Sequence, residues 1–200
     1  MPLTALSVSR ARQGLILAPM LILLPPSEKK ATEPAAAILV YTGVLYAGLG
    51  WATLTTSAKE RAQESLVIIS AKYGVLRPLD QIEPYKEKIA TKKMRGPITR
   101  ALDAIDADLI IDCRSSTYQG VWTPPADKCV EIKVFTEVNG VKKVITHMSK
   151  KTRGEVTRLL LLSKSAPTNP HELRVIVSTE FKCELIEATG KSPWVLEVMC

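Results

Sequence analysis

Three short polar motifs hold the side chains best suited to bind an anion. They cover residues 25–30, 70–85 and 112–118, and each directly follows a short apolar run. Lysine and arginine side chains pair with phosphate, and open α/β sheets bind ligands at the carboxyl ends of their strands. The three motifs are therefore predicted to meet at one binding site, where Lys29 is the anion-binding candidate of the first motif.

The second motif is the densest of the three. It combines two cations, two aromatic rings and one glycine, namely Lys72, Arg77, Tyr73, Tyr85 and Gly74. A rigid loop of this composition can contact phosphates and stack on bases. In the alternative interpretation, Arg77 pairs with Asp80 or Glu83 and only braces the loop.

The third motif adds an arginine and hydroxyl groups after another apolar run. Arg114 and Ser115 can contact an anion at the start of a helix, and Tyr118 lies next to them in the chain. Cys113 precedes this arginine, which would lower the pKa of a thiol beside it. A small buried apolar group is nevertheless the more common fate of such a cysteine, so Cys113 is not predicted to be a nucleophile.

Residues 41–46 place two tyrosines around a hydroxyl group and a glycine. Glycine permits a close approach of the backbone to a ligand, and tyrosine offers a stacking face with a polar tip. Tyr41, Thr42 and Gly43 are therefore pocket candidates, and packing of both rings in the core is the alternative.

The strongest electrostatic feature is a basic cluster, which consists of Lys150, Lys151, Arg153 and Arg158. A helix is predicted over residues 151–164, and cations near its amino end would oppose the helix macrodipole. Contact with an anion is the interpretation that explains this cost. A solvent-exposed basic face is the alternative.

The composition limits the classes of function. A length of 200 residues with 46% hydrophobic residues suits one globular domain. Lysine and arginine number 27 against 20 acidic residues, and the resulting charge of +7 either favours polyanionic partners or serves solubility alone. Four scattered cysteines and two histidines offer few groups for a metal site or a catalytic triad, so neither a metal nor a cofactor is expected.

The apolar run over residues 14–24 resembles a signal peptide only superficially. It is too short to cross a membrane as a helix, and Pro19 interrupts it. We expect a protein that is cytoplasmic, does not contact membranes and keeps its thiols reduced.

In the first half of the chain, buried strands are predicted at 20–24, 67–69 and 108–112, and helices at 40–49, 57–66 and 97–105. Ser57 and Glu60 suggest a capping box, and Pro97 suits the first turn of its helix.

The second half has strands at 130–134 and 141–146 around an Asn139-Gly140 turn, a helix over 151–164, a helix after Pro170, and strands at 183–187 and 194–198. This alternation predicts a single mixed α/β or α+β domain.

Five of these segments, in this order, resemble the signature blocks of the YaaA family: residues 20–30, 40–49, 70–85, 111–122 and 150–161. The resemblance implies a mixed sheet flanked by helices with a basic cleft over residues 20–200, after an extension at 1–19. In this family the segment that matches residues 30–41 is normally longer, and an aromatic pair before the helix at Pro97 is missing here.

The family resemblance also implies protection against peroxide and DNA binding, without an established catalytic activity. Its implied cleft cations are Lys72, Arg77, Arg114, Lys150, Lys151, Arg153 and Arg158, and its implied backbone-shaping residues are Pro25, Gly43, Gly74 and Pro78.

The leading hypothesis is a monomer that binds DNA, including structured or bent DNA, mainly through backbone phosphates. The alternative is an enzyme that acts on a nucleotide-like or phosphorylated small molecule in the same cleft. A third possibility is an interaction protein whose basic face is incidental. A closed pocket would favour the enzyme, and an open groove would favour DNA.

Overall fold

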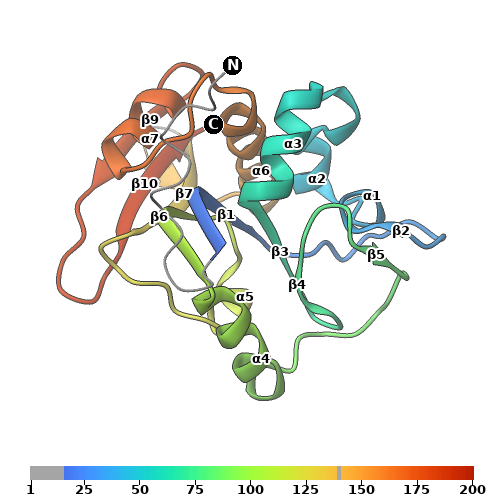
Figure 1. The fold of residues 1–200 in the computed structure, drawn as a ribbon. Coiled ribbons are helices and arrows are strands. Elements are labelled where there is room, and N and C mark those ends of the chain that lie inside the picture. The colour runs from blue at the N-terminus through green and yellow to red at the C-terminus, as the bar shows by residue number, and fades with distance from the viewer. Residues whose placement is uncertain (1–15, 139–140) are drawn as a thin grey trace, which may run out of the picture.

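The chain folds around one mixed β-sheet with helices on both faces (Figure 1). The computed structural model describes residues 16–138 and 141–200. In this part of the chain the strands follow the order β4 (Gly74–Leu76), β3 (Leu66–Ser70), β1 (Ile16–Leu24), β6 (Ile105–Asp112), β7 (Cys129–Val138), β10 (Trp194–Met199) and β9 (Lys182–Ile186). The five inner strands are parallel to one another, whereas the edge strands β4 and β9 are antiparallel to β3 and β10. The predicted mixed α/β fold is confirmed.

The central strand β1 is buried on both faces, which explains its uninterrupted apolar sequence. Met20, Ile22 and Leu24 belong to one core cluster, and Leu21 and Leu23 belong to the other. Helices α2 (Val44–Leu49), α3 (Thr56–Ser65), α6 (Thr146–Leu162) and α7 (Pro170–Val177) contribute to the first cluster. Helix α4 (Thr91–Asp103) contributes to the second, on the opposite face of the sheet (Figure 1).

Short elements connect these layers. They are β2 (Ala35–Ala36) and β5 (Gln81–Ile82), which form a two-stranded ribbon, β8 (Val141–Lys143), which pairs with β7, and the short helices α1 (Ala37–Val40), η1 (Trp51–Thr53) and α5 (Ser116–Gln119). The antiparallel pairing of β7 with β8 confirms the hairpin, but its Asn139-Gly140 turn lies outside the described residues.

Several predicted element starts are wrong, and three of them bear on the site. Strand β1 begins at Ile16 and not at Met20, because residues from Ile16 onward pair with β6. Helix α3 is capped by Thr55, whose side chain accepts a hydrogen bond from the Ala58 N–H, and not by a box at Ser57. Helix α4 begins at Thr91, so Pro97 lies inside it. Residues 57–65 and 97–103 were correctly predicted to be helical, but the first residue of each helix was not.

Helices α2 and α6 cross at two glycines. A Cβ atom on Gly154 would lie far inside contact distance of the Leu45 carbonyl oxygen and 2.8 Å from the Leu49 nitrogen. A Cβ atom on Gly48 would likewise overlap the Lys151 carbonyl oxygen. The two helix backbones are therefore in direct contact, and this contact holds α2 against the sheet beside the loop that follows β1.

Among the described residues, no helix has both the length and the apolar composition needed to cross a membrane.

Candidate functional site

The three polar motifs meet at one edge of the sheet, as the sequence predicts. Strands β3, β1 and β6 are adjacent and parallel, so the loops after Ser70, Leu24 and Asp112 leave the sheet on the same side. The connection from β1 to β3 packs on one face, and α4, which leads to β6, packs on the other. Such a change of side next to a central strand is where open α/β sheets bind ligands. We call this edge the carboxyl-end site.

Four tyrosines, which we call the tyrosine cluster, line the carboxyl-end site: Tyr41, Tyr46, Tyr73 and Tyr85. The ring centroids of Tyr41 and Tyr46 are 5.3 Å apart, those of Tyr41 and Tyr85 are 6.3 Å apart, and those of Tyr73 and Tyr85 are 5.8 Å apart. These distances suit favourable aromatic pairs. The cluster therefore joins the loop around residue 41 to the long second motif.

A hydrogen-bonded chain runs through the centre of this cluster. The hydroxyl groups of Tyr41 and Tyr85 are 2.9 Å apart. Ser70 Oγ donates to Tyr85 Oη at 2.9 Å, and the Ala71 N–H approaches the same oxygen at 3.2 Å. Tyr46 Oη donates to the Pro25 carbonyl at 2.8 Å. The polar ends of three tyrosines are thus fixed by protein atoms, and Tyr41, Tyr46 and Tyr85 are core residues as well as site residues.

Lys30 lies against the cluster, although the sequence analysis selected its neighbour Lys29. Its Nζ atom donates to the Ser27 carbonyl at 2.8 Å and lies 4.3 Å from the ring centroid of Tyr85 and 5.8 Å from that of Tyr41. Burial lowers the pKa of this ammonium group, and the charges of Glu28 and Glu87 partly oppose the shift. Lys29 is exposed and has no side-chain partner among the described residues.

Two glycines shape the backbone here, as the family resemblance implies. A Cβ atom on Gly43 would lie 2.6 Å from Ser27 Cβ, so this glycine lets the start of α2 approach the loop after β1. Gly74 has a φ angle of 79°, which side chains disfavour, and it turns the chain from β3 into β4. Thr42 is exposed beside them, and its N–H donates to the Lys29 carbonyl at 3.1 Å.

Arg114 is not available to a ligand, contrary to the prediction. Its side chain is fully buried and forms two hydrogen bonds to the carboxylate of Asp112, at 2.9 and 2.7 Å. Its Nη1 and Nη2 atoms also donate to the carbonyls of Tyr118 and Trp122, respectively, both at 3.1 Å. This arginine braces the loop after β6. Ser115 precedes the one-turn helix α5, and Tyr118 is half-buried at the site, where burial raises its pKa to about 12.

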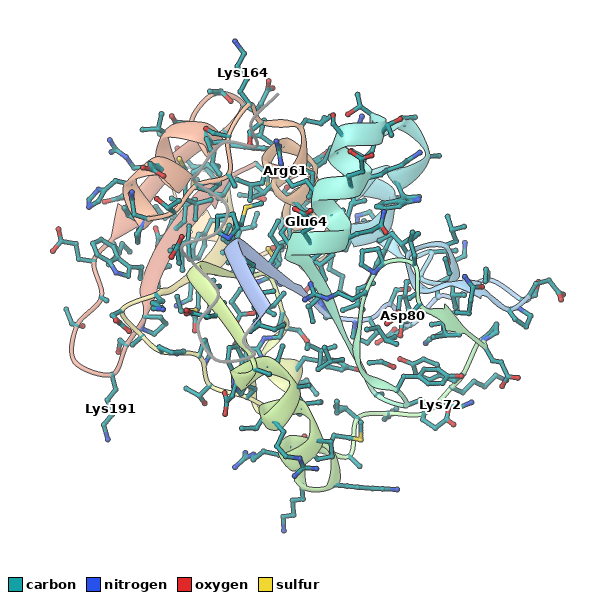
Figure 2. All side chains as sticks on the ribbon, in the orientation of Figure 1. Arg61, Glu64, Lys72, Asp80, Lys164 and Lys191 are labelled. Carbon is teal, nitrogen blue, oxygen red and sulfur yellow. The ribbon has the colours of Figure 1, made fainter. Side chains whose placement is uncertain are left out.

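The guanidinium group of Arg77 lies where β3 begins, at the end of the strand away from the carboxyl-end site. The alternative interpretation, in which Arg77 only braces the loop, therefore holds. Its Nη1 atom donates to the carbonyls of Glu64 and Leu66, at 3.1 and 3.3 Å, where α3 enters β3. Asp80 accepts from the Arg77 backbone N–H at 2.7 Å. Arg77 lines a cavity of about 550 Å³ with Arg61 and Glu64. Figure 2 shows these last two residues well separated from Lys72, which belongs to the carboxyl-end site.

The basic cluster on α6 is largely committed to structural contacts. Because α6 begins at Thr146, the cluster lies beyond the first turn, and the macrodipole argument for an anion does not apply. Arg153 donates to the Ile132 carbonyl, and Arg158 donates to the carbonyls of residues 49 and 50. Lys151 forms an ion pair with Glu155 at 3.2 Å, which leaves Lys150 exposed.

The sequence analysis missed a second basic stretch, which we call the basic segment: residues 86–95. It carries five cations and one carboxylate, and its cations Lys86, Lys88, Lys92, Lys93 and Arg95 are all exposed. None of them forms a salt bridge within the described parts of the chain. Arg95 donates to the Gly120 carbonyl at 2.8 Å, and Met94 lies next to Gly74, so the segment borders the carboxyl-end site. Five cations in ten residues were the signal that could have identified it.

The two buried thiols, Cys113 and Cys129, show no sign of nucleophilic activation. Burial raises the pKa of Cys113 to about 12, and the charge of Arg153 only partly opposes the shift. The expectation of a buried apolar cysteine is therefore confirmed. Cys129 is also buried, and burial raises its pKa as well.

We predict that the free energy of unfolding falls as the pH rises above about 10, the ordinary phenol pKa. Burial raises the pKa values of Tyr41 and Tyr46 above this value, so both stay protonated in the folded state while the unfolded chain ionises. Their contribution to stability is complete below the unfolded pKa and is lost at alkaline pH. Urea unfolding at increasing pH measures this loss.

The Tyr41→Phe variant is the matched control, because it removes one of the phenols and should flatten the alkaline slope. A slope that is the same in the variant and the parent protein would show that this tyrosine does not contribute.

The chain is similar to a known protein family and to several curated proteins. A family model described as peroxide stress protein YaaA matches residues 25–185. A UPF0246 protein of Streptomyces coelicolor is 31% identical over 173 residues, which cover 80% of this chain and 66% of that protein. A UPF0246 protein of Ruegeria pomeroyi is 33% identical over 150 residues, which cover 65% of this chain and 57% of that protein.

A UPF0246 protein of Corynebacterium efficiens is 35% identical over 150 residues, which cover 68% of this chain and 59% of that protein. The chain thus spans 57–66% of the length of these curated relatives. The family model covers most of the chain and includes all three motifs of the carboxyl-end site. The chain therefore belongs to the YaaA family of peroxide stress proteins.

Proposed function

We propose that the chain binds DNA at the carboxyl-end site, mainly through backbone phosphates, as its part in the peroxide stress response. The observation that carries the proposal is the position of the basic segment. Its exposed cations directly follow Tyr85 and border the site, together with Lys29 and Lys72. Phosphate contacts of this kind supply most of the affinity of sequence-independent DNA binding.

The tyrosine cluster supports the same function. Tyr73 is partly exposed and packs edge to face with the buried Tyr85, and Lys72 Nζ lies 5.1 Å from the Tyr73 ring centroid. Aromatic rings beside cations are a common platform for unpaired bases. Lys72 also pairs with Glu83 at 3.8 Å, and both side chains are solvent-accessible, so a phosphate can compete for this lysine. DNA with unpaired or bent regions is the form that this arrangement fits best.

The test is fluorescence anisotropy of short single-stranded, duplex and junction DNA at several salt concentrations. In the Lys86→Gln/Lys88→Gln variant we expect weaker binding, with a salt slope that falls by about 0.9 for each lost phosphate contact. The Lys150→Ala/Lys151→Ala variant tests whether α6 also takes part, and we expect a smaller effect there because Lys151 is paired with Glu155.

The matched control is Lys164→Gln/Lys191→Gln, which removes the same charge. Both side chains are exposed and point outward, well away from Lys72 (Figure 2). An equal loss of binding in this control and in the Lys86→Gln/Lys88→Gln variant would mean that the net charge of +7 acts as a whole and that the carboxyl-end site is not the DNA site.

A further inference from the structure

The ammonium group of Lys30 has an incomplete set of protein partners. It donates one hydrogen bond, to the Ser27 carbonyl at 2.8 Å, and it forms no ion pair within the described chain. An ammonium group carries three donors. A buried structural lysine normally ends on a carboxylate, whereas the side chain of Lys30 ends on two aromatic faces and is still partly accessible. Two donor positions therefore remain for a ligand.

Lys30 is also held in a fixed place. It follows β1, the central strand, and its backbone forms a bridge to Tyr41. The loop around it is fixed by a hydrogen bond from Ser27 Oγ to the Lys29 carbonyl and by the close approach of Gly43 to Ser27. The amine is thus positioned by the loop after β1, by Tyr41 and by Gly43 at the start of α2, which meet at the carboxyl-end site. Fixed, partly desolvated amines of this kind are the lysines that attack carbonyl groups.

We propose that Lys30 forms a Schiff base with the aldehyde of a sugar phosphate. Two sources share this chemistry: the ring-opened deoxyribose of an abasic site in DNA, and a free sugar phosphate. The inference rests on the proposed function only for the first source. The exposed cations Lys29, Lys86 and Lys88 are available for the phosphate in either case.

The reaction is balanced without an oxidant or a further reactant. The ammonium group first gives one proton to solvent, and the neutral Nζ atom attacks the aldehyde carbon. A carbon–nitrogen bond forms, and one proton passes from the nitrogen to the carbonyl oxygen to give a carbinolamine. The hydroxyl group takes back one proton from solvent and leaves as water, and a protonated imine remains. Burial, which lowers the pKa of Lys30, increases the fraction of neutral amine that can begin the reaction.

The experiment traps the imine with borohydride, which reduces it to a stable secondary amine. The parent protein is incubated with an oligonucleotide that contains one abasic site and, separately, with deoxyribose 5-phosphate. Peptide mass spectrometry then locates the adduct. We expect the adduct on Lys30, its loss in Lys30→Arg, and no change in Lys164→Arg, which replaces an exposed lysine well away from Lys72 and the carboxyl-end site (Figure 2).

Binding of intact DNA is measured in parallel for all three proteins. A failure of the Schiff-base proposal can then be distinguished from a failure of the DNA-binding proposal. An adduct on Lys30 with both probes supports the proposed Schiff base. An adduct on Lys30 with the sugar phosphate alone also supports it, but argues against DNA as the partner. An adduct spread over exposed lysines, or no adduct with either probe, overturns the inference even if intact DNA is bound. Because the peptide map is made on the parent protein, this outcome does not depend on the folding of a variant.

Discussion

Replacement of Gly154 by alanine is expected to lower the free energy of unfolding by about 3 kcal/mol, at the upper end of the range for overpacked sites. The added methyl group would overlap the Leu45 carbonyl oxygen and would lie 2.8 Å from the Leu49 nitrogen. Both atoms belong to the backbone of α2, so no side chain can rotate away. The helices must move apart, and this would expose apolar surface between them.

Gly96→Ala is the matched control, because Gly96 is also a helical glycine. The atom nearest to its added Cβ would be Arg100 Nη1, at 3.6 Å, and the residue is exposed. Alanine there should stabilise the protein by about 0.5–1 kcal/mol through its higher helix propensity. Urea unfolding measures both variants, and an unchanged midpoint for Gly154→Ala would contradict the close contact of α2 with α6.

Replacement of Asp112 by alanine is expected to cost about 3–5 kcal/mol, because it leaves a buried charge without its partner. The Arg114 guanidinium group would lose both hydrogen bonds to the carboxylate while it stays enclosed. The same arginine holds the carbonyls of Tyr118 and Trp122, so the loop after β6 should loosen. Thermal unfolding measures the cost, and hydrogen exchange of residues 113–122 reports the loop.

Asp106→Ala removes a partner of comparable chemistry from an exposed pair. Asp106 lies 3.2 Å from Lys128 Nζ, and the two side chains are 41% and 42% exposed. Exposed pairs contribute about 0–1 kcal/mol. If Asp112→Ala and Asp106→Ala have equal costs, burial of the first pair does not matter, and the bracing role assigned to Arg114 is wrong.

The strands were predictable because burial on both faces leaves a simple pattern. Three uninterrupted apolar runs became β1, β3 and β6, and their order made a common edge foreseeable. Helix starts were less predictable because competing signals lie within a few residues of one another. Thr55 and Ser57 can both cap a helix, and only the packing of Ala58 and Ala62 against the sheet selects the first.

The meeting of the three polar motifs at one edge of the sheet was predictable, but the contacts of their cations were not. Sequence identifies an arginine, but it does not show whether its guanidinium group ends on backbone carbonyls, as for Arg77 and Arg158, or in solvent. Lys29 and Lys30 are adjacent and chemically equal, and only the turn at Ser27 decides which one faces the tyrosines. The basic segment, in contrast, was visible as composition and was overlooked.

The central position of β1 also has a consequence for the order of events during synthesis. β1 is made early, but its neighbours on the two sides are β3 and β6, so its second edge stays unpaired until residues 105–112 have left the ribosome. Contacts between distant segments form slowly, and unpaired apolar strands are prone to aggregate. We therefore expect nascent chains that stop before β6 to need chaperones, whereas chains that include β6 can close the centre of the sheet.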